Sequence, residues 1–148
     1  MCGKPWSQDR AMPSSDEPLY HAVLVSRLLR YYDPYSALDL DAGVVARDLR
    51  KFPPRKTPFR QKAFVSRRRW HIARIRFFVE NPEKMDPISL DHEVCKGCFC
   101  FHGPIVVDGH HRLIAAAILR RRRILASYSG LLSTLDYLTG KTRKAPEF

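Results

Sequence analysis

Five consecutive residues, Asp108-Gly109-His110-His111-Arg112, combine side chains that handle phosphate and protons. Histidine titrates near neutral pH, so His110 or His111 would act as a general acid or base. The Asp108 carboxylate would hold a divalent cation or accept a proton, and the Arg112 guanidinium would bind an anion in bidentate fashion. We therefore assign catalysis to Asp108, His110 and His111, and phosphate or nucleotide binding to Gly109, His110, His111 and Arg112.

The elements around this pentapeptide would present its backbone to a ligand. Ile105-Val106-Val107 is a β-branched run typical of a buried strand, and the alanine-rich residues from Leu113 onward predict a helix. Gly109 between them allows a sharp reversal or a close approach by a ligand. The helix would then begin with unpaired N–H groups at the positive end of its dipole, which suit a phosphate. The alternative is a plain strand-to-helix turn that Asp108 caps, with both histidines in solvent.

The pentapeptide and the following Ala115-Ala116 resemble the signature of the ParB/sulfiredoxin superfamily, and the similarity extends from about Trp70 to Gly130. The resemblance implies a small α/β (α+β) domain, with a mixed sheet and packed helices. Partition proteins carry Gly-Glu-Arg-Arg at this place, sulfiredoxins Gly-Cys-His-Arg, and other members Asp-Gly-His-x-Arg. His110 replaces the cysteine that sulfiredoxin activity needs, which argues against peroxiredoxin repair. The Glu-Arg pair of the CTP-dependent partition clamp is also absent.

Members with the Asp-Gly-His-x-Arg version are described as nucleases, ATPases or small-molecule kinases. The resemblance therefore implies phosphoryl or phosphodiester chemistry, with ATP or CTP as candidate nucleotides and Mg²⁺ or Mn²⁺ at Asp108. Asp86 and Asp91 flank a strand expected to run near the pentapeptide, so either would join Asp108 around a metal. Asp86 precedes Pro87, however, and an aspartate in that position is more often a turn residue.

A zinc site is the other metal hypothesis. Cys95, Cys98 and Cys100 lie between His92 and His102, and the first two have knuckle-like spacing. A structural zinc site normally takes a second ligand pair from a distant element. The alternation over residues 98–101 instead fits a hairpin strand with reduced thiols. We therefore do not expect zinc.

Positive charge is concentrated in one part of the chain. The net charge is +11, and residues 50–76 hold eleven Lys and Arg side chains with no Asp or Glu. Such a segment would follow the phosphate backbone of nucleic acid, DNA above all, while interleaved aromatics stack on bases. The alternative is a solvated basic face. The candidate contacts are Arg55, Lys56, Arg60, Lys62, Arg67, Arg68 and Arg69. The run of residues 120–123 is either helix stabilisation or a second patch.

The chain divides into a flexible tail (1–17), an N-terminal helical extension with a basic connector (18–64), the ParB/sulfiredoxin-like domain (65–140) and a basic tail (141–148). Hydrophobic periodicity predicts helices over Leu19–Tyr32, Ser36–Leu49, Val65–Val79 and Leu131–Leu138. Strands are predicted at Ile88–Leu90, Ile105–Val107 and Ile124–Tyr128. Residues 92–102 would form a hairpin.

No apolar run is long enough to cross a membrane, and residues 1–17 lack the apolar centre of a signal peptide, so we expect a cytoplasmic protein. The leading hypothesis is a ParB-like protein that binds nucleotide or nucleic-acid phosphate, with nuclease or NTP-hydrolysing activity. A non-catalytic DNA-binding accessory protein and a small-molecule kinase of the same fold stay open as alternatives. The sequence leaves the oligomeric state open.

Overall fold

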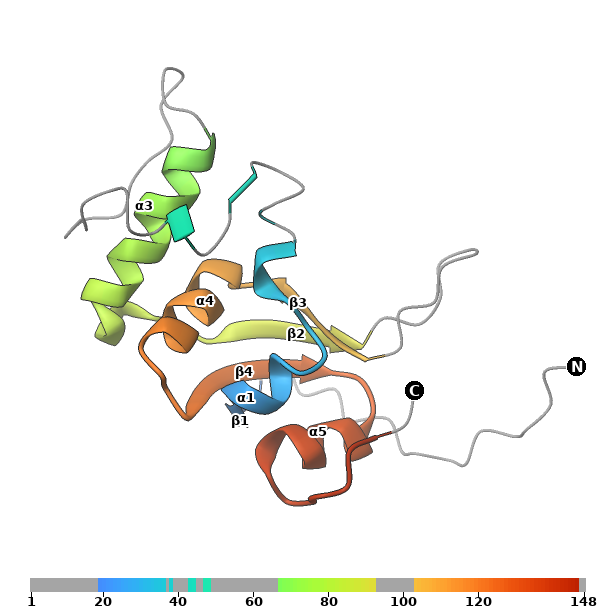
Figure 1. Cartoon of the computed structure of the whole chain (residues 1–148). Helices are drawn as coiled ribbons and strands as arrows, with labels where there is room; N and C mark the ends of the chain where they lie inside the picture. The colour runs from blue at the N-terminus through green and yellow to red at the C-terminus, as the bar shows by residue number, and fades with distance from the viewer. Residues whose placement is uncertain are drawn as a thin grey trace, which may run out of the picture.

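The computed structural model describes residues 19–36, 38, 43–44, 47–48, 67–92 and 103–146 (Figure 1). The N-terminal part contains strand β1 (Tyr20–Leu24) and the short helix α1 (Val25–Leu28). The remaining elements follow in the order α3 (Arg67–Glu80), the 3-10 turn η2 (Pro82–Lys84), β2 (Ile88–His92), β3 (Pro104–Asp108), α4 (His110–Ile118), β4 (Arg123–Ser129) and α5 (Leu132–Thr139).

The four strands form one mixed sheet in the order β1-β4-β2-β3. β1 pairs antiparallel with β4, β2 pairs antiparallel with β3, and the central pair β2–β4 is parallel. The antiparallel return from β2 to β3 agrees with the predicted hairpin, whose residues 93–102 lie outside the described part of the chain. A mixed sheet with packed helices confirms the predicted α+β class.

The main core lies between the helices and one face of the sheet. Along β4, Ile124, Ala126 and Tyr128 are buried, whereas Leu125 between them is 52% exposed, as expected when side chains alternate across a pleated strand. The buried strand residues join side chains from α1, α4 and α5 in one cluster. Each fully buried leucine or isoleucine there contributes about 1.5–3 kcal/mol to folding.

Helices α3 and α4 pack side by side and run in the same direction (Figure 1). Ile72 and Ile75 of α3 share a cluster with Ile114 of α4, and further along α3 Phe77 and Phe78 cluster with Ala115. At the beginning of both helices, Trp70 lies against His111. The N-terminal ends of the two helices are therefore neighbours.

The predicted helix over Leu19–Tyr32 is wrong, because this segment supplies a strand followed by one helical turn. The apolar residues fit a helical spacing, but Val23 also lies opposite Ile124 in the register of the sheet. Pairing with β4 satisfies the hydrogen-bonding groups of a strand edge that would otherwise be open, and this outweighs local helical preference. The N-terminal segment thus belongs to the same sheet as β3, the strand that ends at Asp108 of the pentapeptide.

The prediction of one helix over Ser36–Leu49 is confirmed only at its beginning, where Ser36 and Leu38 are helical. Gly43 has a φ of 62°, and neither it nor Val44 is helical. The left-handed conformation of Gly43 interrupts any α-helix there, since helices require negative φ at every residue.

The helix predicted near Val65–Val79 is confirmed as α3, which ends at Glu80 before Asn81-Pro82. The strands predicted at Ile88–Leu90, Ile105–Val107 and Ile124–Tyr128 are confirmed as β2, β3 and β4. The last predicted helix is α5, which ends at Gly140 in the left-handed conformation. None of the helices in the described ranges combines the length and the apolar surface needed to cross a bilayer.

Candidate functional site

The pentapeptide forms a tight connection between β3 and α4. Asp108 is the last residue of β3, Gly109 has a φ of 100°, and His110 begins the helix. A Cβ atom on Gly109 would lie 2.5 Å from the Ile88 Cγ2 atom. The glycine is therefore required by the neighbouring strand β2, so its role in the fold does not depend on a ligand.

The beginning of α4 carries no side-chain cap. The alternative of a turn capped by Asp108 is therefore not what the structure shows, since that carboxylate bonds to Arg112 instead. No acidic residue lies in the first turn of α4. The N–H groups at this helix end consequently keep the positive potential that attracts anions.

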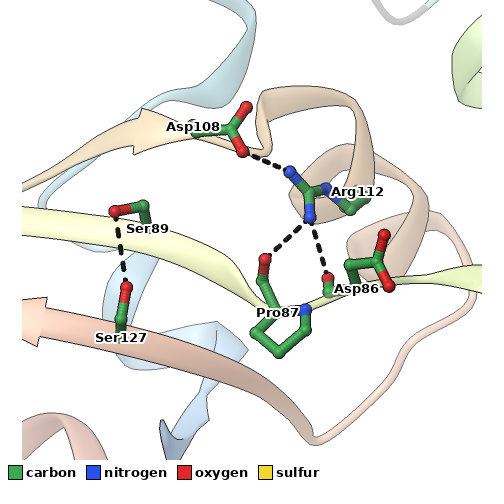
Figure 2. A network of polar contacts seen from close by, with 6 residues as sticks. All are labelled: Asp86, Pro87, Ser89, Asp108, Arg112 and Ser127. Atoms are coloured by element: carbon green, nitrogen blue, oxygen red, sulfur yellow. Dashed lines mark hydrogen bonds and ion pairs between the residues drawn. The ribbon is translucent and has the colours of Figure 1, made fainter. Parts of the chain in front are cut away.

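Arg112 binds groups of the protein on two sides (Figure 2). Its guanidinium donates to the Pro87 carbonyl at 2.7 Å, to the Asp86 carbonyl at 3.1 Å and to the Asp108 carboxylate at 2.5 Å. The Arg112 side chain is 12% exposed and that of Asp108 is 73% exposed. Arg112 therefore links the residues just before β2 to the β3–α4 turn. Its contact with phosphate stays a prediction.

The two histidines of the signature are each held by a residue from another element. His110 Nε2 is hydrogen-bonded to the Tyr32 hydroxyl at 2.8 Å, and His111 Nε2 is hydrogen-bonded to His71 Nδ1 at 2.7 Å. The His71 and His111 rings stack with centroids 5.0 Å apart, and Trp70 meets both edge-on. Neither histidine is a solvated surface residue. We call Tyr32, Trp70, His71, His110 and His111 the imidazole cluster.

The surroundings of His110 and His111 favour the neutral form of their rings. Burial, followed by repulsion from His71, Arg74, His110 and Arg112, lowers the pKa of His111 to about 3. Burial also lowers the pKa of His110, and His71 acts in the same direction while Asp108 opposes it. Both rings are therefore neutral at pH 7. A neutral imidazole can accept a proton or donate its single N–H.

Three consecutive arginines lie in the first turn of α3, which contains no acidic residue. Cations at a helix N-terminus face the positive end of the dipole, which is an unfavourable position for them. Arg68 pairs with the fully buried Asp48 at 2.5 Å. Because α3 and α4 run in parallel, Arg67, Arg68 and Arg69 lie at the same end of the helix pair as the imidazole cluster.

The carboxylates predicted around a metal are only partly brought together. The Asp86 backbone meets Asp108 through Arg112, but Asp91 pairs with Ile105, three residues before Asp108 along β3. Within the described ranges, no group of three or more His, Cys, Asp or Glu side chains is placed to hold a metal ion. Ser89 lies opposite Asp108 in the sheet, and Ser127 donates to the Ser89 hydroxyl at 3.4 Å (Figure 2).

Some predicted residues lie outside the described part of the chain. These are the basic residues Arg55, Lys56, Arg60 and Lys62, and the candidate zinc ligands Cys95, Cys98, Cys100 and His102.

Sequence analysis missed Tyr32 and His71 as members of the site. Tyr32 is 78 residues from its partner His110, and His71 is 40 residues from His111. Nothing in the local spacing marks such pairs, although a histidine on the apolar face of α3 was a usable signal. Comparisons with protein-family models, curated proteins and solved structures found no match.

Proposed function

We propose that this protein binds a phosphate group of nucleic acid or of a nucleotide at the β3–α4 turn. The observation that carries the proposal is the parallel packing of α3 on α4. It gathers two positive helix ends, three arginines and two neutral histidines, without an acidic residue in either first turn. An anionic ligand would interact favourably with the two positive helix ends.

The chemistry that suits this place is hydrolysis of a phosphoester or phosphoanhydride. His110 is the proton-transferring group in this proposal, because its ring is neutral and held by Tyr32. His111 is more deeply buried, so its part is to support His110 and α4 through His71. Asp108 is exposed beside both, as a base or as an anchor for a cation.

Mg²⁺ or Mn²⁺ fits this place only if the phosphates of the ligand supply part of its coordination. Asp108 offers one exposed carboxylate, and Mg²⁺ is commonly held by one or two carboxylates together with substrate phosphates. When bound, the ion would neutralise charge on the phosphate. Arg112 meanwhile keeps Asp108 pointing toward the start of α4.

The strand–turn–helix around the pentapeptide and the mixed sheet also support a fold of the ParB/sulfiredoxin type as part of the proposal. In that setting, nuclease or NTP-hydrolysing activity is the favoured function.

A non-catalytic DNA-binding protein is the second candidate. It is favoured because the Arg112 guanidinium is already bonded to three protein groups, one of which is the Asp108 carboxylate.

The test uses the purified full chain with ATP, CTP, and single- and double-stranded DNA, with and without Mg²⁺ or Mn²⁺. Asp108→Asn keeps the shape of the side chain and removes its charge, so turnover should fall at least tenfold in this variant. Asp91→Asn, at the other end of the same strand pair, is the control and should be unchanged. DNA binding without any turnover would select the second candidate. Absence of binding to all four ligands would refute the proposal.

A further inference from the structure

A second basic surface lies at the opposite end of α4. The turn between α4 and β4 contains Arg120, Arg121 and Arg122, Arg123 begins β4, and the segment after α5 adds Lys141, Arg143 and Lys144. The two segments are adjacent, because Arg123 donates to the Thr139 carbonyl at 2.9 Å. We call these seven residues the arginine-turn surface. Lys141 of this surface pairs with Asp136 at 3.4 Å.

Apart from Arg123, whose guanidinium bonds to the Thr139 carbonyl, these charges are not needed to complete the helix ends. The last turn of α4 is closed by backbone bonds, from Arg120 N to the Ala117 carbonyl at 3.0 Å and from Arg121 N to the Ala116 carbonyl at 2.9 Å. The carbonyls at the end of α5 accept hydrogen bonds from Arg27 and Arg123.

The guanidinium groups of Arg120, Arg121 and Arg122 form no hydrogen bond or ion pair with any residue that the structure describes. All three residues are exposed. Helix stabilisation therefore does not account for them, apart from a long-range dipole contribution.

The turn keeps an arginine where the backbone favours glycine. Arg120 has a φ of 52°, and within the described residues no other side-chain-bearing residue has a positive φ. This position of a helix-ending motif is usually glycine, because a Cβ atom is strained in the left-handed region. A strained conformation that presents an unpaired cation to solvent points to a use for that cation.

We propose that the arginine-turn surface binds the phosphate backbone of a nucleic acid. Several guanidinium groups spread over two segments match an extended polyanion better than a single phosphate, and arginine suits phosphate geometry. The two segments, 118–123 and 139–144, contain no Trp, Tyr or Phe, the side chains that commonly seat proteins at a membrane interface. The inference deepens the proposed function, on which it rests for the ligand class, by favouring nucleic acid over a free nucleotide.

The test measures binding of fluorescent DNA and of ATP to the full chain over a series of salt concentrations. Arg121→Ser/Arg122→Ser should weaken DNA binding at 0.1 M salt by roughly eightfold for each phosphate that the variant no longer neutralises, and should lower the salt slope by about one for each such phosphate. ATP binding should stay unchanged in this variant. The control Arg30→Ser/Lys84→Ser removes the same charge from two other exposed positions and should leave DNA binding within about twofold.

Arg120→Gly guards against a loss caused by misfolding, since it should raise the melting temperature while it weakens DNA binding. Equal losses of DNA affinity in the control and test variants would overturn the inference, because net charge alone would then explain the binding. So would unchanged DNA binding in the test variants, or preferential binding to vesicles that contain phosphatidylserine. Loss of ATP binding in Asp108→Asn, with the effect of Arg121→Ser/Arg122→Ser retained, would separate the two sites.

Discussion

His111 makes the stability of the protein depend on pH. Its pKa of about 3 in the folded state lies below the ordinary value of 6.5, so the unfolded chain binds the proton more tightly. The contribution of His111 to stability is therefore fully present above pH 6.5 and is lost as the pH falls from about 6.5 toward 3. This group alone should remove about 1.4 kcal/mol for each pH unit well below 6.5. Denaturant unfolding at several pH values measures the slope, and His111→Gln should flatten it.

The Tyr32 hydroxyl holds the His110 ring through a hydrogen bond of 2.8 Å. Tyr32→Phe should cost about 1 kcal/mol of unfolding free energy, the net value of one hydrogen bond. It should also release His110 from a single tautomer, because the bond to Nε2 sets which ring nitrogen carries the proton. Nitrogen NMR of the imidazole reports the tautomer directly. An unchanged His110 spectrum would show that another group holds the ring.

At the scale of the element, the β3–α4 connection depends on Gly109. Gly109→Ala should cost more than about 2 kcal/mol, because it adds a strained φ of 100° to a 2.5 Å clash with Ile88 Cγ2. Gly43→Ala is the matched control, since Gly43 has a φ of 62° and nothing within 4 Å of a Cβ atom. Its cost should be about 1 kcal/mol, from conformation alone. If chemical denaturation showed equal losses of unfolding free energy in the two variants, the Ile88 side chain would have moved to accommodate the added methyl group.

A substitution at the end of α4 should stabilise the protein. Arg120→Gly should raise the unfolding free energy by about 0.5–1 kcal/mol, since glycine relieves the φ of 52° and keeps the helix-ending bonds. The gain is reduced by the greater freedom of glycine in the unfolded chain. Thermal unfolding of this variant beside Arg121→Ser isolates the backbone effect from that of charge. A loss of stability would mean that the Arg120 side chain has a structural role.

The same element shows why sequence could predict most of the fold. The strand at 105–107, Gly109 and the alanine-rich residues after it have local preferences that agree with their final structure, so β3 and α4 lie where expected. β2, β4 and α5 follow for the same reason. β1 was missed because its pattern fits two structures, and only pairing with a strand 100 residues away decides between them.

At the scale of the whole molecule, the candidate site combines what sequence can and cannot predict. The pentapeptide is local, and its five residues were found together. The partners that set their chemistry come from the segment after α1 and from α3, so only tertiary packing reveals them. Arg112 also bonds to backbone carbonyls of Asp86 and Pro87, and no side-chain pattern indicates a carbonyl as a partner.

β1 is part of the sheet, and its removal should therefore damage the whole molecule. A chain that lacks residues 1–28 would lose the buried Val23 and Leu28 and would expose the edge of β4. We expect this chain to lose cooperative unfolding and to aggregate. Circular dichroism melting and size-exclusion chromatography check this outcome. A monomeric, cooperatively folding fragment would show that the remaining three strands suffice.

The pairing of residues 20–24 with 123–127 also determines when the chain can fold. During synthesis the first strand leaves the ribosome long before its partner exists, and the central strand β4 is needed by β1 and β2 alike. The sheet can therefore close only after residues 123–129 have emerged, and such distant pairing is slow. Until then, the unpaired N-terminal segment depends on chaperones or on its own polar surroundings to stay out of aggregates.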